Sequence, residues 1–131
     1  MKNKYIESYM FFLFLLFCGC ANIAPPNGGE KDTSAPKLLS ATPANKSVFF
    51  NSNKVILKFD EYIQLKNVNL IQMSPGCGEK VNISQKGKQI EIAFSCILDT
   101  NTTYSINFGN SIIDLNEGNE LKNFKYIFST G

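Results

Sequence analysis

Apolar and polar residues alternate along several short stretches of this chain, which leaves few folds open to it. The clearest examples are KVILKF at residues 54–59, TYSINF at 103–108 and FKYIF at 124–128. Because successive side chains of a strand point to opposite faces, each stretch presents one apolar face to a core. No stretch shows a helical period, and turns rich in Asn, Gly, Pro and Lys separate the segments. We therefore predict an all-β, antiparallel sandwich of about seven strands, the first at residues 37–41 and a weaker one at VNLIQM, residues 68–73.

A hairpin around Lys86–Gly87 supports this interpretation. If these two residues form the turn, the flanking strands are brought into one defined register. The residues that then oppose each other are Ile83 with Ile90, Val81 with Ile92, and Cys77 with Cys96.

This register predicts a disulfide between Cys77 and Cys96. Opposed residues of an antiparallel pair have Cα atoms about 4.5–5.5 Å apart, which is within disulfide range. A turn one residue later, at Gly87–Lys88, would keep the apolar faces but offset the two sulfurs. Two buried free thiols are the other alternative.

The N-terminal segment is typical of an export signal that ends at a cysteine. An unbroken apolar run, Met10–Cys18, is too short to span a bilayer, which needs about 20 residues, but fits a secretory signal. Leu16–Cys20 resembles the lipobox of bacterial lipoproteins, although Phe17 is bulkier than the usual residue at its position. The resemblance implies that Cys20 is lipidated, becomes the mature N-terminus and anchors the chain. A plain signal peptide with incidental cysteines is the alternative.

These features divide the chain into three predicted segments. Residues 1–19 form a lipoprotein signal peptide, residues 20–36 the lipidated cysteine and a flexible linker, and residues 37–131 the sandwich. The linker contains Pro25-Pro26 and Asn27-Gly28-Gly29, which favour extended or flexible chain over packed structure. With Cys18 removed and Cys20 acylated, two cysteines remain in an exported, oxidising setting.

The types of charged residue argue against catalysis and nucleic-acid binding. The formal net charge is +2, all thirteen basic residues are lysine, and histidine is absent. Without arginine the chain lacks the planar fork that recognises phosphate and guanine. Without histidine it lacks the usual general base near neutral pH. We expect no enzyme activity, no cofactor and no nucleic-acid partner.

One acidic turn is a weak candidate for a calcium site. Residues 114–120, DLNEGNE, gather oxygen ligands that hard cations prefer, and the candidate ligands are Asp114, Asn116, Glu117 and Asn119. Gly118 falls one position too early for an EF-hand loop, and a hairpin turn explains the same residues. Asp60 and Glu61 are adjacent in a strand and so point to opposite faces, which makes a charged strand end the simpler interpretation.

Several motifs resemble the SbsA-type bacterial Ig-like domain, in particular the copies near the N-terminus of Bacteroidota envelope lipoproteins. The matching motifs are P-x-L-x-x-x-x-P at 36–43, L-x-F-D-E at 57–61, N-T-T-Y-x-I-N-F at 101–108, D-L-N-E-G-N at 114–119 and F-S-T-G at 128–131. The resemblance covers residues 36–131 and implies an Ig-like β-sandwich in a family of structural and adhesive modules without a shared active site.

Together these inferences predict a lipid-anchored Ig-like module of the bacterial cell envelope with a structural, scaffold or adhesion role. The expected location is the outer membrane, facing either the periplasm or the cell surface. The expected partners are the membrane, through the N-terminal lipid, and other envelope proteins or glycans. A small calcium- or carbohydrate-binding accessory lipoprotein is the alternative.

Overall fold

A computed structural model describes residues 28–77 and 81–131, and the compact unit within it spans Lys31–Gly131. The predicted signal segment, including Cys18 and the lipidation candidate Cys20, lies outside the described residues. Within the described part, the one helical element is a short 3₁₀ turn, Val68–Leu70, and no helix is long and apolar enough to cross a membrane.

Four antiparallel strands form the first sheet, in the order β1-β2-β6-β5. Their bounds are β1 Leu38–Thr42, β2 Lys54–Phe59, β5 Val81–Lys86 and β6 Gln89–Phe94. Along β2 the residues alternate between buried and solvent-facing positions, as KVILKF predicts.

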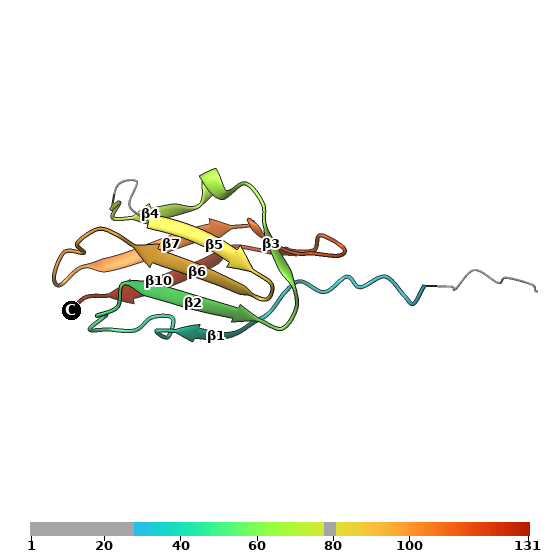
Figure 1. Cartoon of the computed structure of the whole chain (residues 1–131), viewed down its shortest axis with the longest axis horizontal. Helices are drawn as coiled ribbons and strands as arrows, with labels where there is room; N and C mark the ends of the chain where they lie inside the picture. Colours follow the sequence, from blue (N-terminus) through green and yellow to red (C-terminus); the bar gives the residue numbers. More distant parts are fainter. Residues whose placement is uncertain (1–27, 78–80) are drawn as a thin grey trace, which may run out of the picture. The chain divides into compact units, whose positions relative to one another are not determined.

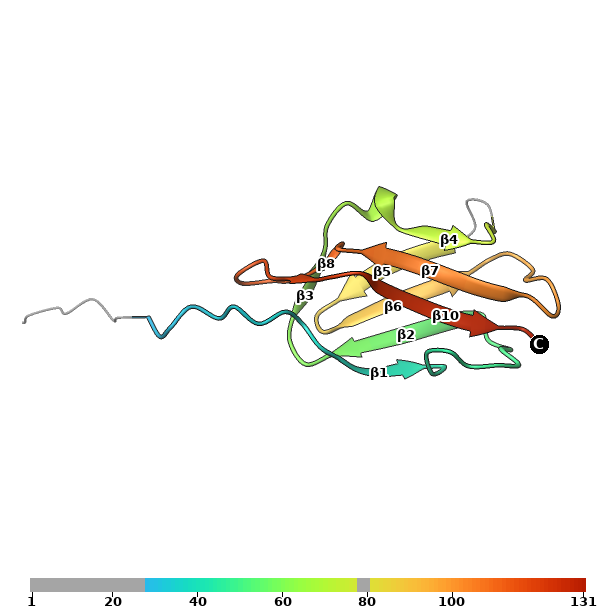
Figure 2. The same cartoon turned by 180° about the vertical axis from the view of Figure 1, so that it is seen from behind.

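The second sheet has three antiparallel strands in the order β10-β7-β4 and lies on the side nearer the viewer in Figure 2. Its strands are β4 Gln72–Ser74, β7 Thr103–Gly109 and β10 Phe124–Ser129. The four strands of the first sheet and the three of the second make the expected seven. The prediction of an all-β antiparallel sandwich is therefore confirmed.

A third, small sheet was not predicted. It joins β3 Ile63–Leu65, β8 Ile112–Asp114 and β9 Glu120–Leu121 in the order β3-β8-β9. The β8–β9 hairpin extends from the end of the sandwich opposite the C-terminus (Figures 1 and 2).

The core lies between the two main sheets and is rich in aromatic rings. Phe94 of β6 meets Phe128 of β10 at 5.6 Å between ring centroids, and Phe59 of β2 meets Phe124 of β10 at 6.3 Å. Burying such a side chain contributes roughly 1.5–3 kcal/mol. The alternating apolar positions of β2, β6, β7 and β10 thus hold the two sheets together.

Between β1 and β2 the chain passes from one sheet to the other. β1 pairs with β2, and Ser47 then forms a parallel bridge with Phe128 of β10. The Asn45 side chain accepts a hydrogen bond from the Ile127 N–H at 2.8 Å, and the Phe50 N–H donates to the Ser129 carbonyl at 2.8 Å. Segment 45–50 therefore covers the edge of β10, where unpaired backbone groups would otherwise be open to another strand.

The hairpin between β5 and β6 corrects one prediction. Its turn is Gly87–Lys88, so Ile83 pairs with Ile92 rather than Ile90, and Val81 pairs with Phe94 rather than Ile92. Gly87 has a φ of +62°, and a two-residue hairpin turn with a positive φ at its first position favours glycine there. The apolar side chains keep their predicted face, but the predicted register is wrong.

The predicted weak strand at residues 68–73 is also only partly right. Its second half is β4, but Val68–Leu70 is the 3₁₀ turn, and Val68 and Leu70 are exposed. Asn67 adopts the left-handed conformation, with φ 53°, and its carbonyl accepts the Leu70 N–H at 2.8 Å. Asparagine enters this conformation more readily than most residues. Asn67 therefore starts a turn at residues 68–70, where the alternation of apolar residues had suggested a strand.

Candidate functional site

The two sheets are linked covalently at one end by a disulfide. Cys77 follows β4 of the second sheet, Cys96 follows β6 of the first, and their Cα atoms are 6.1 Å apart. The predicted pairing of these cysteines is therefore confirmed. The predicted reason is wrong, because both cysteines lie beyond the β5–β6 ladder, which begins at Val81 and ends at Phe94. The bond clamps two loops that lead out of opposite sheets.

In the acidic turn, Asp114 organises the backbone. Its carboxylate accepts hydrogen bonds from the N–H groups of Glu117 at 2.6 Å, Gly118 at 2.9 Å and Asn119 at 2.8 Å. The side chain is only 1% exposed, and Gly118 has a φ of +78°. Asp114 thus closes the β8–β9 loop, since N–H groups within a tight turn would otherwise be left without partners.

The acidic side chains around this turn influence one another. Burial raises the pKa of the Asp114 carboxyl, but the three backbone N–H bonds outweigh it and hold this pKa below its ordinary value. Burial raises the pKa of the Glu61 carboxyl, and repulsion from Asp114 and Asp60 raises it further. The end of the molecule near the β8–β9 loop is therefore acidic.

The geometry does not assemble the four calcium candidates into one ligand set. Both oxygens of Asp114 are directed to backbone N–H groups, and the Asn119 side-chain amide donates to the Asp32 carbonyl at 3.1 Å. Asn116 and Glu117 are exposed. Among the described residues, no group of three or more Cys, Asp and Glu side chains is placed to hold a metal ion. The backbone contacts of Asp114 are instead those of a hairpin turn, the other interpretation of residues 114–120.

Asp60, the other acidic candidate, ties the start of the domain to β2. Its carboxylate accepts the Lys37 N–H at 2.8 Å, and its backbone carbonyl accepts a hydrogen bond from the Lys88 ammonium at 2.7 Å. The role of Asp60 is thus to fix the position at which the chain enters the sandwich.

At the opposite end of the sandwich, near the C-terminus, two loops enclose a cleft of about 630 Å³. One loop joins β1 to β2 and the other joins β6 to β7, and both lie at the end marked C in Figure 1. We call this the end cleft. Its lining residues are Phe49, Phe50, Asn51, Ser52, Asn53, Phe94, Cys96, Leu98, Asp99, Thr100 and Thr130.

Aromatic rings supply the apolar part of the end cleft. Phe50 and Phe94 are each 7% exposed and pack edge to face at 5.9 Å between centroids. Phe49 differs from both: it is 78% exposed and has a φ of +52°. A bulky residue is rarely found in this left-handed conformation. The chain thus holds one aromatic ring open to solvent beside a buried aromatic floor.

Polar side chains supply the rest of the lining. Within the described part of the chain, the side chains of Asn51, Asn53, Asp99 and Thr100 make no hydrogen bond or ion pair to other residues. Asparagine offers both donors and acceptors, and a carboxylate offers acceptors only. These groups are therefore available to a ligand.

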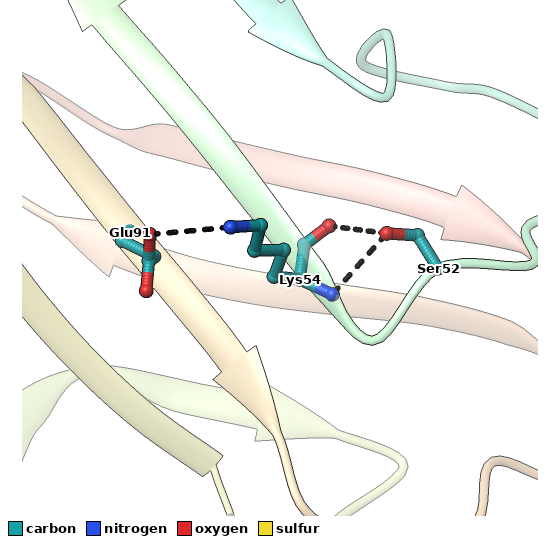
Figure 3. A network of polar contacts seen from close by, with 3 residues as sticks. All are labelled: Ser52, Lys54 and Glu91. Atoms are coloured by element: carbon teal, nitrogen blue, oxygen red, sulfur yellow. Dashed lines mark hydrogen bonds and ion pairs between the residues drawn. The ribbon is translucent and has the colours of Figure 1, made fainter.

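The loops that carry these side chains are anchored. The Ser52 hydroxyl donates to the Lys54 carbonyl at 2.7 Å and accepts the Lys54 N–H at 3.2 Å, while the Lys54 ammonium lies 3.9 Å from Glu91. Figure 3 draws these three residues and the contacts between them. On the other loop, the Asp99 N–H donates to the Tyr104 hydroxyl at 2.8 Å. Such a bond from a strand tyrosine to backbone just upstream is known from Ig-fold tyrosine corners. Both walls of the end cleft are thus held in place.

The end cleft is difficult to predict from the sequence. Its residues come from three parts of the chain, 49–53, 94–100 and Thr130, and follow no spacing that a motif would show. The one local signal is Phe49-Phe50 followed by Asn51-Ser52-Asn53, because two adjacent aromatic side chains of an extended chain cannot both enter the core.

A family model described as "Bacterial Ig-like domain" matches residues 32–130. Among solved structures, the chain is similar to PcoC, described as a methionine-rich copper resistance protein from Escherichia coli. That likeness has 19% sequence identity and a TM-score of 0.48, over 72% of this chain and 97% of that chain. No curated protein matches the chain.

Proposed function

We propose that this chain, which belongs to the bacterial Ig-like domain family, is a lipid-anchored Ig-like module of the bacterial cell envelope. Its role is structural, as a scaffold or in adhesion, and it acts through its surface without catalysis. Its motifs resemble SbsA-type domains of Bacteroidota envelope lipoproteins, which favours the outer membrane as its location.

The disulfide is the observation that carries this proposal. Cys77 and Cys96 are joined, and structural disulfides form and persist in oxidising compartments outside the cytoplasm. The other two cysteines, Cys18 and Cys20, both lie at the end of the apolar leading segment. Export would remove Cys18 with the signal and leave Cys20 for acylation, so that each of the four cysteines has a defined fate.

The acidic residues support a role without catalysis. Histidine is absent from the sequence, and a nucleophile needs an adjacent base to activate it. Asp60 and Asp114 use their carboxylates to hold backbone N–H groups. Both are thus engaged in fixing the fold.

Mass spectrometry of the mature N-terminus tests the proposal. The chain would be expressed with its own leader in a Bacteroidota host, and membrane and soluble fractions analysed separately. We expect a membrane-bound product whose first residue is acylated Cys20. Cys20→Ser should abolish acylation, whereas the matched control Cys18→Ser should leave it intact. A bare thiol at Cys20, cleavage at another residue, or an intact leader in the cytosol would contradict the proposal.

A further inference from the structure

We propose that the end cleft binds an uncharged saccharide. This inference goes beyond the envelope role, since it concerns residues 49–130 and does not depend on the anchor, but it would supply that role with a ligand. The volume of the cleft, about 630 Å³, lies within the roughly 300–1,000 Å³ of small-molecule sites.

The exposed ring of Phe49 is the first reason for a saccharide. A sugar ring carries one face of C–H groups, which packs on the flat face of an aromatic side chain and covers its apolar surface. Phe49 offers such a face to solvent and is 78% exposed. Its positive φ of 52° is a conformation that such a residue rarely adopts, and unusual backbone of this kind is concentrated at functional sites.

The polar groups are the second reason. A sugar presents many hydroxyls, each of which can donate and accept; amides can return both kinds of hydrogen bond, and a carboxylate accepts from the hydroxyl donors. Asn51, Asn53 and Asp99 provide two amides and one carboxylate beside the aromatic ring. Because their loops are already anchored by Ser52 and Tyr104, binding would cost little ordering of the site.

The charge of the cleft argues for an uncharged ligand. Among the residues that the structure describes, its lining contains the carboxylate of Asp99 and no lysine. An anionic sugar or a phosphate would meet a like charge in this described lining, which is unfavourable. A single carboxylate amid amides and hydroxyls is, by contrast, well suited to accept hydrogen bonds from neutral hydroxyls.

Isothermal titration calorimetry on the full chain tests the inference. The protein would be kept in a polyoxyethylene detergent, because maltoside and glucoside detergents carry sugar headgroups. The probes are cellotetraose, chitotetraose, mannotetraose and maltotetraose at millimolar concentration, with hexalysine as a cationic comparison. We expect saturable binding of at least one tetrasaccharide.

Three variants locate the binding. Phe49→Ala and Asp99→Ala should each weaken affinity about tenfold or more. Tyr62→Ala is the matched control: it removes another exposed aromatic ring, one that does not line the end cleft, and should leave affinity unchanged. Retention of the thermal melting transition and of the Cys77–Cys96 bond shows that each variant is folded.

Several outcomes would overturn the inference. These are failure of all four tetrasaccharides to bind at millimolar concentration, binding that Phe49→Ala and Asp99→Ala leave unchanged, and binding of hexalysine alone. None of them bears on the N-terminal lipid, so failure of this site and failure of the envelope proposal are distinguished by separate measurements.

Discussion

Cys77 and Cys96 join the loop after β4 to the loop after β6 and thereby connect the two sheets of the sandwich. The bond closes a chain segment with a sequence separation of 19. Constraining a loop of that size in the unfolded chain contributes about 3 kcal/mol to stability. The β5–β6 hairpin lies entirely within the closed segment.

The first prediction is that Cys77→Ala/Cys96→Ala lowers the free energy of unfolding by about 3 kcal/mol. The cause is the greater freedom of the unfolded chain once the link is absent. Urea unfolding of the wild-type and double-variant chains in oxidising buffer measures the difference. Under reductant the two proteins should become nearly equal, and a difference that persists there would point to lost packing instead of the lost bond.

The second prediction concerns Asp114 and acid pH. Since the folded state holds its pKa below the ordinary value, the unfolded state takes up the proton first as pH falls. The contribution of Asp114 is therefore fully present above the unfolded pKa, about 3.9, and is lost as pH falls through the folded pKa. Asp114→Asn should lower stability at neutral pH, because an amide group directs N–H donors at backbone N–H donors.

Urea unfolding at a series of pH values checks this. Glu117→Gln is the matched control, because Glu117 is exposed in the same loop and its side chain accepts none of these bonds. We expect the wild-type and Asp114→Asn curves to converge toward low pH, while Glu117→Gln follows the wild type. Parallel curves for wild type and Asp114→Asn across the whole range would show that the carboxylate charge contributes nothing.

The third prediction concerns calcium. Because both carboxylate oxygens of Asp114 are occupied by backbone N–H groups, we expect calcium at millimolar concentration to leave the melting temperature unchanged. A ligand that binds only the folded state must raise the melting temperature by mass action. A rise that EDTA reverses, and that Asp114→Asn abolishes, would contradict this prediction and restore the calcium interpretation of the turn.

Much of the fold could be predicted because each strand of a sandwich buries one face, so apolar and polar residues alternate along its sequence. The buried faces of β2, β7 and β10 were identified in this way. The alternation of apolar and polar residues does not determine, however, which residues of two neighbouring strands are paired. The position of the turn at Gly87–Lys88 depends on which residue takes a positive φ. Moving the turn by one residue shifts the pairing of the two strands by two positions, so every apolar side chain of the hairpin stays on the same face.

The end cleft could not be predicted in the same way. Its two loops have no period, and they meet only because β2, β6, β7 and β10 bring their ends together. The Asp114 turn was recognised as acidic, but oxygen-rich side chains suit a cation and a network of backbone N–H groups equally well. Only the directions of the N–H groups distinguish the two.

The last prediction separates two adjacent phenylalanines. Phe50 is 7% exposed and packs against Phe128 at 4.1 Å between centroids, so Phe50→Ala should lower the free energy of unfolding by about 3–5 kcal/mol. Phe49 is 78% exposed, with a φ of +52°, a conformation that costs most residues roughly 1–2 kcal/mol and that asparagine tolerates better.

Phe49→Asn should therefore leave the free energy of unfolding unchanged or raise it by up to about 1 kcal/mol, as measured by urea unfolding beside Phe50→Ala. A gain in stability would mean that the wild-type chain keeps Phe49 at a cost, which folding alone does not explain and a ligand at the end cleft does. If Phe49→Asn destabilises the chain as much as Phe50→Ala, the ring of Phe49 belongs to the core and is not free to meet a saccharide.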